Sequence, residues 1–278
     1  VATDRFDEDD PSEAQVAALC SPAFGIGADG FIRAVERDGV WFMDYRNADG
    51  TISEMCGNGV RAFVEYLRTE GLISLEVGEH VSIGTRAGVK TVARTDTGYA
   101  VDMGPWSFIH GDAAREGGED SQVSARGLKT PRPALSISMG NPHTVVMLGS
   151  DGKLDGLDLG VAPVVTPAPE NGTNVEFVVP LELEHDSGDI GVLGEQSEVG
   201  AIRLRVHERG VGETLSCGTG ACAAAAATRF WGGEDAPDEW LVHVPGGTLA
   251  VTFVLGPDDL EHVVLAGGAQ MVYTAQLS

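Results

Sequence analysis

One short pattern occurs twice in this chain: a cysteine, then Gly-x-Gly, then an apolar run. The copies begin Cys56-Gly57-Asn58-Gly59 and Cys217-Gly218-Thr219-Gly220. The first run has an apolar residue every three or four positions, and the second is mostly alanine, so both runs predict helices. A helix begins with a partial positive charge and with N–H groups that have no partner inside the helix. We therefore expect each cysteine at a helix start, where thiolate is favoured over thiol.

Strands are predicted around both helices in a similar order. Around the first helix they fall at 31–35, 40–45, 81–83, 89–93 and 99–103. Around the second helix they fall at 202–206, 240–244, 248–254 and 262–265. This order predicts an α/β (α+β) fold of two similar lobes that arose by internal duplication.

The lobe boundaries are predicted from a composition shift and from the end of the chain. The shift lies at 106–135, where we expect the crossover between the lobes. A last strand, at 271–275, is expected to return to the first lobe. We therefore expect one lobe of residues 1–105 plus 266–278 with Cys56, and another of 106–265 with Cys217. A helix is also expected over 12–20, with Ser12 as its N-cap.

Length and charge exclude several kinds of partner. A chain of 278 residues suits one large domain or two of about 130 residues each. Its net charge of −24 repels phosphate backbones, so no nucleic-acid partner is expected. No apolar run reaches the roughly 18 residues of a membrane span, and no membrane partner is expected. The acidic start of the chain lacks the apolar core of a signal peptide, which predicts a cytoplasmic protein.

Few residues are suited to holding a cofactor or a metal. The chain has three lysines, Lys90, Lys129 and Lys153, and none has the context of a Schiff-base lysine. Its seven histidines lack ligand spacing, so no metal site is expected. A long chain that is poor in cysteine is not a disulfide scaffold. Cys20 and Cys222 lie in apolar or alanine-rich helical segments, and we expect both to be buried and inert.

Further polar residues cluster in loops punctuated by glycine or proline. These loops contain Asn47, Asn141-Pro142-His143, Asn174 and Glu208-Arg209. Loop asparagines most often form turns, whereas a loop arginine is a good bidentate partner for a carboxylate. The glycines of each cysteine pattern would let backbone N–H groups approach a small anion such as a carboxylate. Gly218-Thr219-Gly220 also fits a nucleotide-binding string, but a polar loop separates it from the preceding strand.

Together these motifs resemble the diaminopimelate epimerase family of cofactor-independent amino-acid epimerases and racemases. The resemblance covers nearly the whole chain, and the segments that carry it are 41–50, 55–59, 139–143, 174–176 and 207–220. It implies two similar lobes, each a curled, mostly antiparallel sheet around a central helix, with the active site in the cleft. It also implies a homodimer that uses no cofactor. The implied reaction converts LL-2,6-diaminopimelate to the meso form, in lysine and peptidoglycan synthesis.

The resemblance also implies a role for each candidate residue. Cys56 and Cys217 would be the two catalytic bases, one entering as thiolate and the other as thiol. His143 and Glu208 would tune the cysteine pKa values. The residues implied to contact substrate are Asn47, Asn58, Asn141, Asn174, Glu208 and Arg209, together with the backbone N–H groups of Gly57, Asn58, Gly218 and Thr219.

The sequence departs from the family at two places. Family members begin with a strand that carries a Gly-x-x-Asn-Asp-Phe segment, and we expect this chain to start after it, which would weaken folding and substrate binding. Gly30 stands where many relatives carry a substrate-contacting glutamine.

Other functions remain open at this stage. One alternative is a racemase of another amino acid, such as proline, hydroxyproline or histidine, with the same cysteine pair. A second is a non-catalytic protein that binds small molecules. We also hypothesise that Cys56 and Cys217 can oxidise to a disulfide when no substrate is bound.

Overall fold

The computed structural model describes residues 10–53, 55–182, 184–185 and 198–275. The acidic segment of residues 1–9 lies outside the described residues. The chain divides into two compact units, Val1–Val101 with Gly268–Ser278 and Asp102–Gly267. The second unit is therefore one continuous stretch, whereas the first is assembled from both ends of the sequence.

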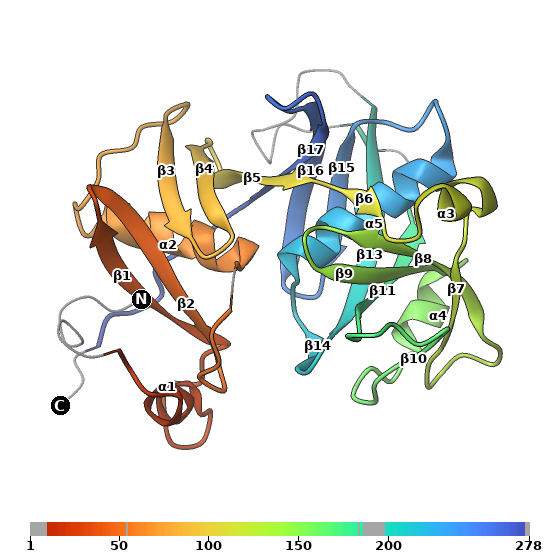
Figure 1. Ribbon diagram of the computed structural model, residues 1–278, viewed down its shortest axis with the longest axis horizontal. Coiled ribbons are helices and arrows are strands. Elements are labelled where there is room, and N and C mark those ends of the chain that lie inside the picture. The colour runs from red at the N-terminus through yellow and green to blue at the C-terminus, as the bar shows by residue number, and fades with distance from the viewer. Residues whose placement is uncertain (1–9, 54, 183, 186–197, 276–278) are drawn as a thin grey trace. The chain divides into compact units, whose positions relative to one another are not determined.

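In its described residues the first unit holds two helices and a five-stranded sheet in the order β1-β2-β3-β4-β5 (Figure 1). Its elements are α1 (Glu13–Cys20), β1 (Gly30–Arg37), β2 (Val40–Asn47), α2 (Gly57–Thr69), β3 (His80–Thr85), β4 (Gly88–Arg94) and β5 (Tyr99–Pro105), which continues into the second unit. Neighbouring strands are antiparallel except β2 and β3, which are parallel and are joined through α2. A parallel pair needs such a crossover, and the helix that carries the first cysteine pattern supplies it.

The second unit is larger and contains three helices in its described residues (Figure 1). Its elements are β6 (Ser107–Phe108), α3 (Gly111–Gly117), β7 (Ser121–Ser124), β8 (Arg132–Ser138), β9 (Pro142–Met147), α4 (Asp151–Asp155), β10 (Val164–Thr166), β11 (Asn174–Pro180), β12 (Glu184–His185), β13 (Glu198–Glu208), β14 (Gly212–Thr214), α5 (Gly218–Gly232), β15 (Glu239–Val244), β16 (Gly247–Leu255) and β17 (Glu261–Gly267). Its main sheet runs β6-β8-β9-β11-β13-β15-β16-β17.

The second cysteine pattern repeats the topology of the first. Strands β13 and β15 are parallel and are joined through α5, and β16 and β17 follow as antiparallel neighbours. The same sequence of elements, β2, α2, β3, β4 and β5, makes up most of the first unit. The predicted mixed α/β fold is thus confirmed, together with the order of strands around each helix.

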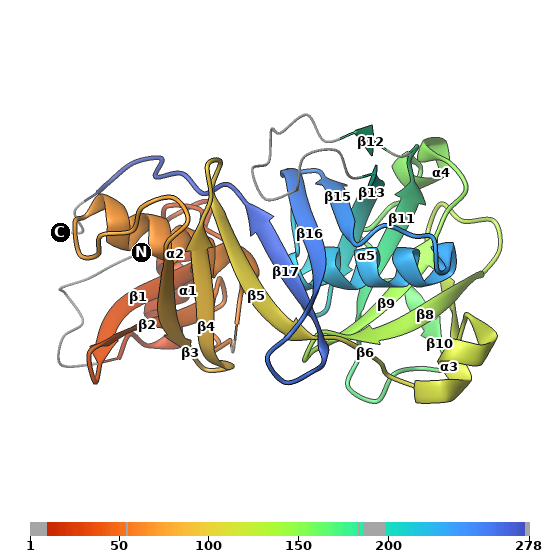
Figure 2. The same ribbon diagram turned by 90° about the horizontal axis from the view of Figure 1, so that it is seen from above.

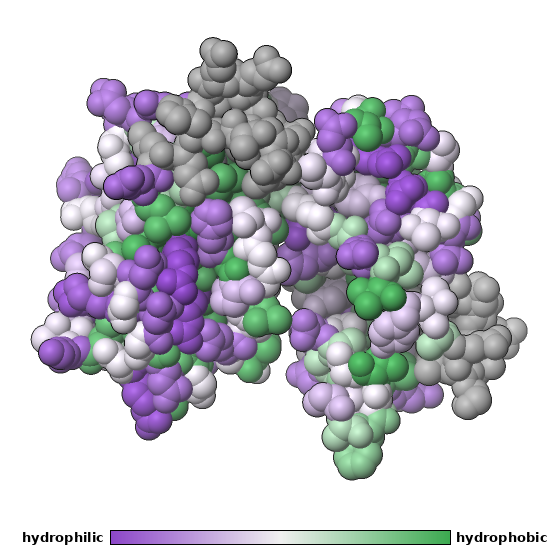
Figure 3. Space-filling view, turned by 180° about the vertical axis from the view of Figure 1, so that it is seen from behind, coloured by the Kyte–Doolittle hydropathy of each residue, from purple (hydrophilic) through white to green (hydrophobic). Residues whose placement is uncertain are grey.

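Each long helix packs according to its sequence. In α2 the apolar stripe of Val60, Phe63, Val64 and Leu67 is fully buried. In α5 nearly every residue from Ala221 to Ala227 is buried, because strands from β8 to β17 contact the helix (Figures 1 and 2). A helix touched by both ends of a sheet requires the sheet to curl, and alanine side chains let strands approach it closely. Figure 3 shows hydrophilic residues interspersed with hydrophobic ones over one face of the molecule.

The predictions for the first helix, for two further cysteines and for the last strand had different outcomes. The first helix is confirmed, and Ser12 and Gln15 form a capping box at its start. Cys20 and Cys222 are buried, as expected. The strand predicted at 271–275 is wrong: these residues form no strand, and all but the first are exposed. The pattern Met-Val-Tyr-Thr-Ala favours a strand, but a strand also needs a hydrogen-bonding neighbour, and none pairs with it among the described residues.

The region from 106 to 135 was predicted to be the crossover between the lobes, and much of it forms regular secondary structure. It contains β6, α3 and β7 and the start of β8, all in the second unit.

Candidate functional site

Cys56 is the N-cap residue of α2. Its Sγ accepts a hydrogen bond from the backbone N–H of Gly59 at 3.3 Å. A Cβ atom on Gly59 would lie 3.2 Å from the Cys56 Cβ and 3.4 Å from its Sγ, so the glycine permits this close approach. The sulfur therefore sits where an N-cap oxygen usually sits, at the positive end of the helix. This position favours the negatively charged thiolate.

A buried arginine holds the first turn of α2. Arg61, 4% exposed, donates from Nη2 to Asn58 Oδ1 at 2.9 Å and from Nη1 to the Gly57 carbonyl at 3.1 Å. These bonds fix the Asn58 side chain and one carbonyl group of the first turn. Sequence reasoning missed Arg61, although a charged residue directly after a buried valine was a usable signal.

Asn47 ends β2 and forms the turn that follows. Its backbone N–H donates to the Thr51 carbonyl at 2.9 Å, and its Nδ2 donates to Thr51 Oγ1 at 3.0 Å. The turn-forming interpretation of this asparagine therefore agrees with the structure. Its predicted substrate contact remains a proposal.

Cys217 is the N-cap residue of α5 and is 7% exposed. Its Sγ lies 3.7 Å from Thr219 Oγ1. Burial raises the pKa of the Cys217 thiol well above its usual value, and the negative charge of Glu208 raises it further, as does that of Glu176 when this carboxyl group is ionised. The Thr219 hydroxyl and the Gly220 N–H act in the opposite direction but are outweighed. Burial and acidic neighbours thus oppose the effect of the helix start here and favour the protonated thiol at Cys217.

A series of side-chain hydrogen bonds connects this end of α5 to residues at the start of β9 and in β11. Asn141 Nδ2 donates to Thr219 Oγ1 at 3.3 Å, and Asn141 Oδ1 lies 3.0 Å from Nε2 of His143. On the other side of the ring, His143 Nδ1 lies 2.7 Å from Glu176 Oε1, and neither residue is exposed to solvent. Burial raises the pKa of the Glu176 carboxyl group. Sequence reasoning missed Glu176, although an acid within an apolar strand was the signal for it.

Other predicted residues lie on the β13–β14 hairpin and at the start of the neighbouring strand β11. Asn174 is 6% exposed and accepts the Arg209 N–H at its Oδ1 at 2.9 Å, while its Nδ2 donates to the Pro142 carbonyl at 3.3 Å. Glu208 accepts a hydrogen bond from the Thr214 hydroxyl. The Arg209 guanidinium donates to the Asn171 carbonyl at 2.6 Å. Asn174 therefore joins the start of β9 to this hairpin.

Sheet register explains why residues far apart in sequence meet at Cys217. Asn174 of β11 is paired with His143 of β9, and Val175 is paired with His207 of β13. The same end of each strand therefore holds a predicted polar residue, and α5 begins directly after the β13–β14 hairpin. Seven predicted residues are placed in this region: Asn141, His143, Asn174, Glu208, Arg209, Gly218 and Thr219.

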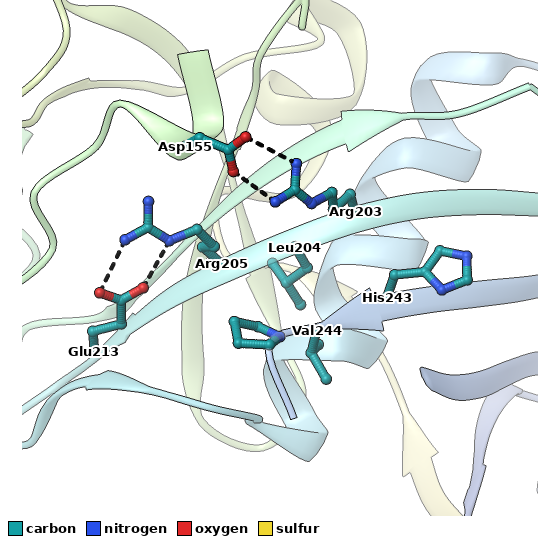
Figure 4. A pocket seen from close by; sticks show the side chains of 8 residues that line it. Asp155, Arg203, Leu204, Arg205, Glu213, His243 and Val244 are labelled. Carbon is teal, nitrogen blue, oxygen red and sulfur yellow. Dashed lines mark hydrogen bonds and ion pairs between the residues drawn. The ribbon is translucent and has the colours of Figure 1, made fainter. Parts of the chain in front are cut away.

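A separate pocket of the second unit contains none of the predicted residues (Figure 4). Its charged side chains pair with one another, Arg203 with Asp155 and Arg205 with Glu213. No group of three potential metal-ligating side chains occurs in the described part of the chain. Within the same residues, no helix has both the length and the apolarity needed to cross a membrane.

Known proteins resemble this chain in sequence and in fold. The family model for diaminopimelate epimerase matches residues 1–109 and 135–272. A diaminopimelate epimerase of Streptomyces coelicolor is 39% identical over 86% of this chain and 78% of its own length. The Thermobifida fusca diaminopimelate epimerase is 37% identical over 96% of this chain and 92% of its own length.

Among solved structures, a phenazine biosynthesis protein of the PhzF family from Bacillus anthracis has the same fold. It aligns with a TM-score of 0.59 at 14% identity, covering 87% of this chain and 82% of that protein.

Proposed function

Because the chain belongs to the diaminopimelate epimerase family, we propose that it converts LL-2,6-diaminopimelate to meso-diaminopimelate without a cofactor. The observation that carries this proposal is the matched placement of Cys56 and Cys217. Each is the N-cap residue of a helix, each helix joins two parallel strands, and each sulfur is approached closely by a glycine of the first turn.

The two cysteines differ in the protonation state that their surroundings favour. Cys56 accepts a backbone N–H bond at a helix start, which suits a thiolate base. Cys217 is buried beside two acids, which suits a thiol that donates a proton. Epimerisation needs one group of each kind, acting on opposite faces of one α-carbon. We assign Cys56 as the base and Cys217 as the acid in one direction, with the roles exchanged in the reverse direction.

In the proposed reaction, the Cys56 thiolate takes the α-proton and the electron pair of the C–H bond stays on the substrate. Negative charge then develops on the α-carbon and spreads onto the adjacent carboxylate. Backbone N–H groups at the helix starts, from Gly57, Asn58, Gly218 and Thr219, would stabilise that charge. The Cys217 thiol then returns a proton to the opposite face and becomes the thiolate. No proton is gained or lost in the full cycle.

Residues near the helix starts would identify the substrate. Arg209 offers a bidentate donor to a carboxylate, and Asn47, Asn58, Asn141, Asn174 and Glu208 would complete the polar contacts. His143 and Glu208 would adjust the pKa of the cysteines. Following the family resemblance, we also propose a cytoplasmic homodimer that serves lysine and peptidoglycan synthesis, with lobes of residues 1–105 plus 266–278 and 106–265.

Proton exchange in deuterated water tests both the reaction and the substrate. We expect α-deuterium to enter LL- and meso-diaminopimelate but not proline, hydroxyproline or histidine. Deuterium in one of the latter alone would instead establish a different racemase. Exchange with none of them would support a binding protein.

Three variants test the cysteine assignment. Cys56→Ala and Cys217→Ala should each abolish epimerisation. Cys222→Ala is a matched control, since Cys222 lies in the same helix as Cys217 and is fully buried among alanines. It should retain activity. Full activity in Cys56→Ala would refute the two-base mechanism.

A further inference from the structure

Glu176 is an acid at an unusual place in the fold. It lies in the middle of β11, where six consecutive residues from Asn174 to Val179 are buried. Its side chain is fully buried, and its Oε2 atom has no hydrogen-bond partner within the described residues. Burying a carboxyl group with an unsatisfied oxygen destabilises a protein, so packing alone does not explain this residue. Among the described side chains, its hydrogen-bond partner is Nδ1 of His143, 2.7 Å from Oε1.

The contact with His143 begins a chain of hydrogen bonds whose direction can be derived. With the Asn141 amide oriented as in the structure, its Oδ1 faces Nε2 of His143 at 3.0 Å, and since an amide oxygen only accepts, Nε2 is the donor in this orientation. Asn141 then donates from Nδ2 to Thr219 Oγ1 at 3.3 Å. The Thr219 oxygen has thereby accepted a bond, and its own hydrogen is available for Cys217 Sγ at 3.7 Å.

One proton is shared at the buried end of the chain. With Nε2 of His143 already protonated, the contact between Nδ1 and Oε1 needs a single further hydrogen, either on the carboxyl group or on the ring. Burial of Glu176 favours the carboxylic acid, since that form is uncharged. In either form the pair has no net charge and holds the ring in one orientation.

Without Glu176 the chain loses its fixed direction. The His143 ring would be free to carry its hydrogen on Nδ1 and to accept at Nε2. Asn141 would then turn its amide to donate to the ring and present Oδ1 to Thr219. The threonine hydroxyl would donate to that oxygen, and the sulfur would lose its donor. The same heavy atoms can be bonded in either direction, so a group at the far end decides between them.

We propose that Glu176 is a positioning residue for Cys217, which orients His143 so that a directed hydrogen-bond chain through Asn141 and Thr219 ends on the sulfur and stabilises its thiolate. The catalytic importance of this effect rests on the proposed function. The effect on the sulfur itself does not, and it can be measured without substrate.

The test measures alkylation of Cys217 by iodoacetamide as a function of pH, in a Cys56→Ala background, with the modified residue identified by peptide mass spectrometry. Glu176→Leu removes the hydrogen bond but keeps an apolar side chain of similar size. We expect its alkylation near pH 8 to be about tenfold slower, with the pH profile shifted upward, since a hydrogen bond to a charged group is lost. Glu176→Gln can still bond to Nδ1, and we expect it to stay within about threefold of the parent.

Two controls separate positioning from damage to the fold. Thr144→Val removes another buried side-chain hydrogen bond from β9, the 3.1 Å bond to Thr173, and should leave Cys217 alkylation unchanged. Thr219→Val should slow alkylation as Glu176→Leu does, whereas Thr219→Ser keeps the hydroxyl and should not.

NMR of ¹⁵N-labelled histidine should show hydrogen on Nε2 of His143 in the parent and in Glu176→Gln. That signal should change in Glu176→Leu.

An unchanged alkylation profile in a folded Glu176→Leu variant would overturn the proposal, as would equal slowing in Glu176→Gln. Slowing in Thr144→Val would show that general loosening is responsible, and would overturn it too. Epimerisation is assayed separately with Cys56 restored. If Cys217→Ala remained active while Glu176→Leu shifted the alkylation profile, the proposed function would fail and the positioning role would stand.

Discussion

The Arg86 guanidinium joins the buried Asp44 carboxylate to two carbonyl groups of the chain that leads to Cys56. Its Nη2 pairs with Asp44, which is 1% exposed, and its Nη1 donates to the Tyr45 and Ser53 carbonyls at 2.9 and 3.3 Å. These carbonyls lie on either side of the Asn47 turn. One side chain from the β3–β4 hairpin therefore closes the loop that begins with Asn47.

Arg86→Gln should loosen this loop. We expect the free energy of unfolding to fall by about 2 kcal/mol, since charge-assisted hydrogen bonds to a buried partner are lost. Chemical denaturation measures this loss. Arg94→Gln, in the same hairpin, is the control: Arg94 pairs with the exposed Glu76 and donates to a single carbonyl, that of Leu75, so the loss should be smaller, about 1 kcal/mol. Equal losses of unfolding free energy in both variants would contradict the role of Arg86 in closing this loop.

Gly220→Ala should disturb the Cys217 half of the site. An added Cβ would lie 2.8 Å from Glu176 Oε1 and 3.2 Å from Cys217 Sγ, so the carboxyl group must move. We expect a loss of about 1–3 kcal/mol from overpacking, together with reduced epimerisation. Gly117→Ala, a helical glycine with open space around its Cβ position, should be neutral or slightly stabilising. Thermal unfolding and the epimerisation assay give both comparisons.

Glu208→Gln should make Cys217 more reactive at neutral pH. The negative charge of Glu208 helps to raise the pKa of the thiol, and glutamine removes that charge while its oxygen can still accept from Thr214. Iodoacetamide labelling in a Cys56→Ala background should therefore reach half its maximal rate at a lower pH. A profile that does not move would show that Glu208 is uncharged or screened.

His262 should stabilise the second unit most strongly in mild acid. Its hydrogen bond to Asp102 raises the pKa of the imidazole above its usual value near 6.5, with a smaller effect from Asp258. The protonated form is favoured by folding. Its stabilisation is therefore complete below about pH 6.5 and is lost as pH rises through the raised pKa.

Thermal unfolding of the parent chain and of His262→Gln tests this expectation. The difference in melting temperature should be largest near pH 5.5 and should shrink towards pH 8.5. A difference that grows with pH would reverse the assignment.

Local sequence patterns predicted most of the elements around the two cysteines. The apolar spacing in α2 gave its buried face, and alternation in segments such as 202–206 gave the strands. The strand at 271–275 had an equally favourable pattern and was wrong, since alternation describes a surface and not the neighbour that must pair with it. Local propensity decides an element only where the fold supplies such a neighbour.

The polar residues of the site were only partly predictable. Asn141, His143 and Asn174 stand out in loops and at strand ends, and register brings them together. Glu176 and Arg61 escaped notice because each is a charged residue within an apolar segment, where its partner is set by tertiary packing. Likewise, a helix start predicts a thiolate at Cys217, whereas its buried surroundings in the folded protein raise the pKa and favour the thiol.

The division of the chain also has a consequence for its synthesis. A ribosome releases residues in order, and domains commonly begin to fold while the remainder is still being translated. Asp102–Gly267 can then reach its native contacts before the last stretch of the unit that was translated first has emerged. Truncation after Gly267 would therefore leave the second unit whole and shorten the first, although most of the first unit precedes it in the chain.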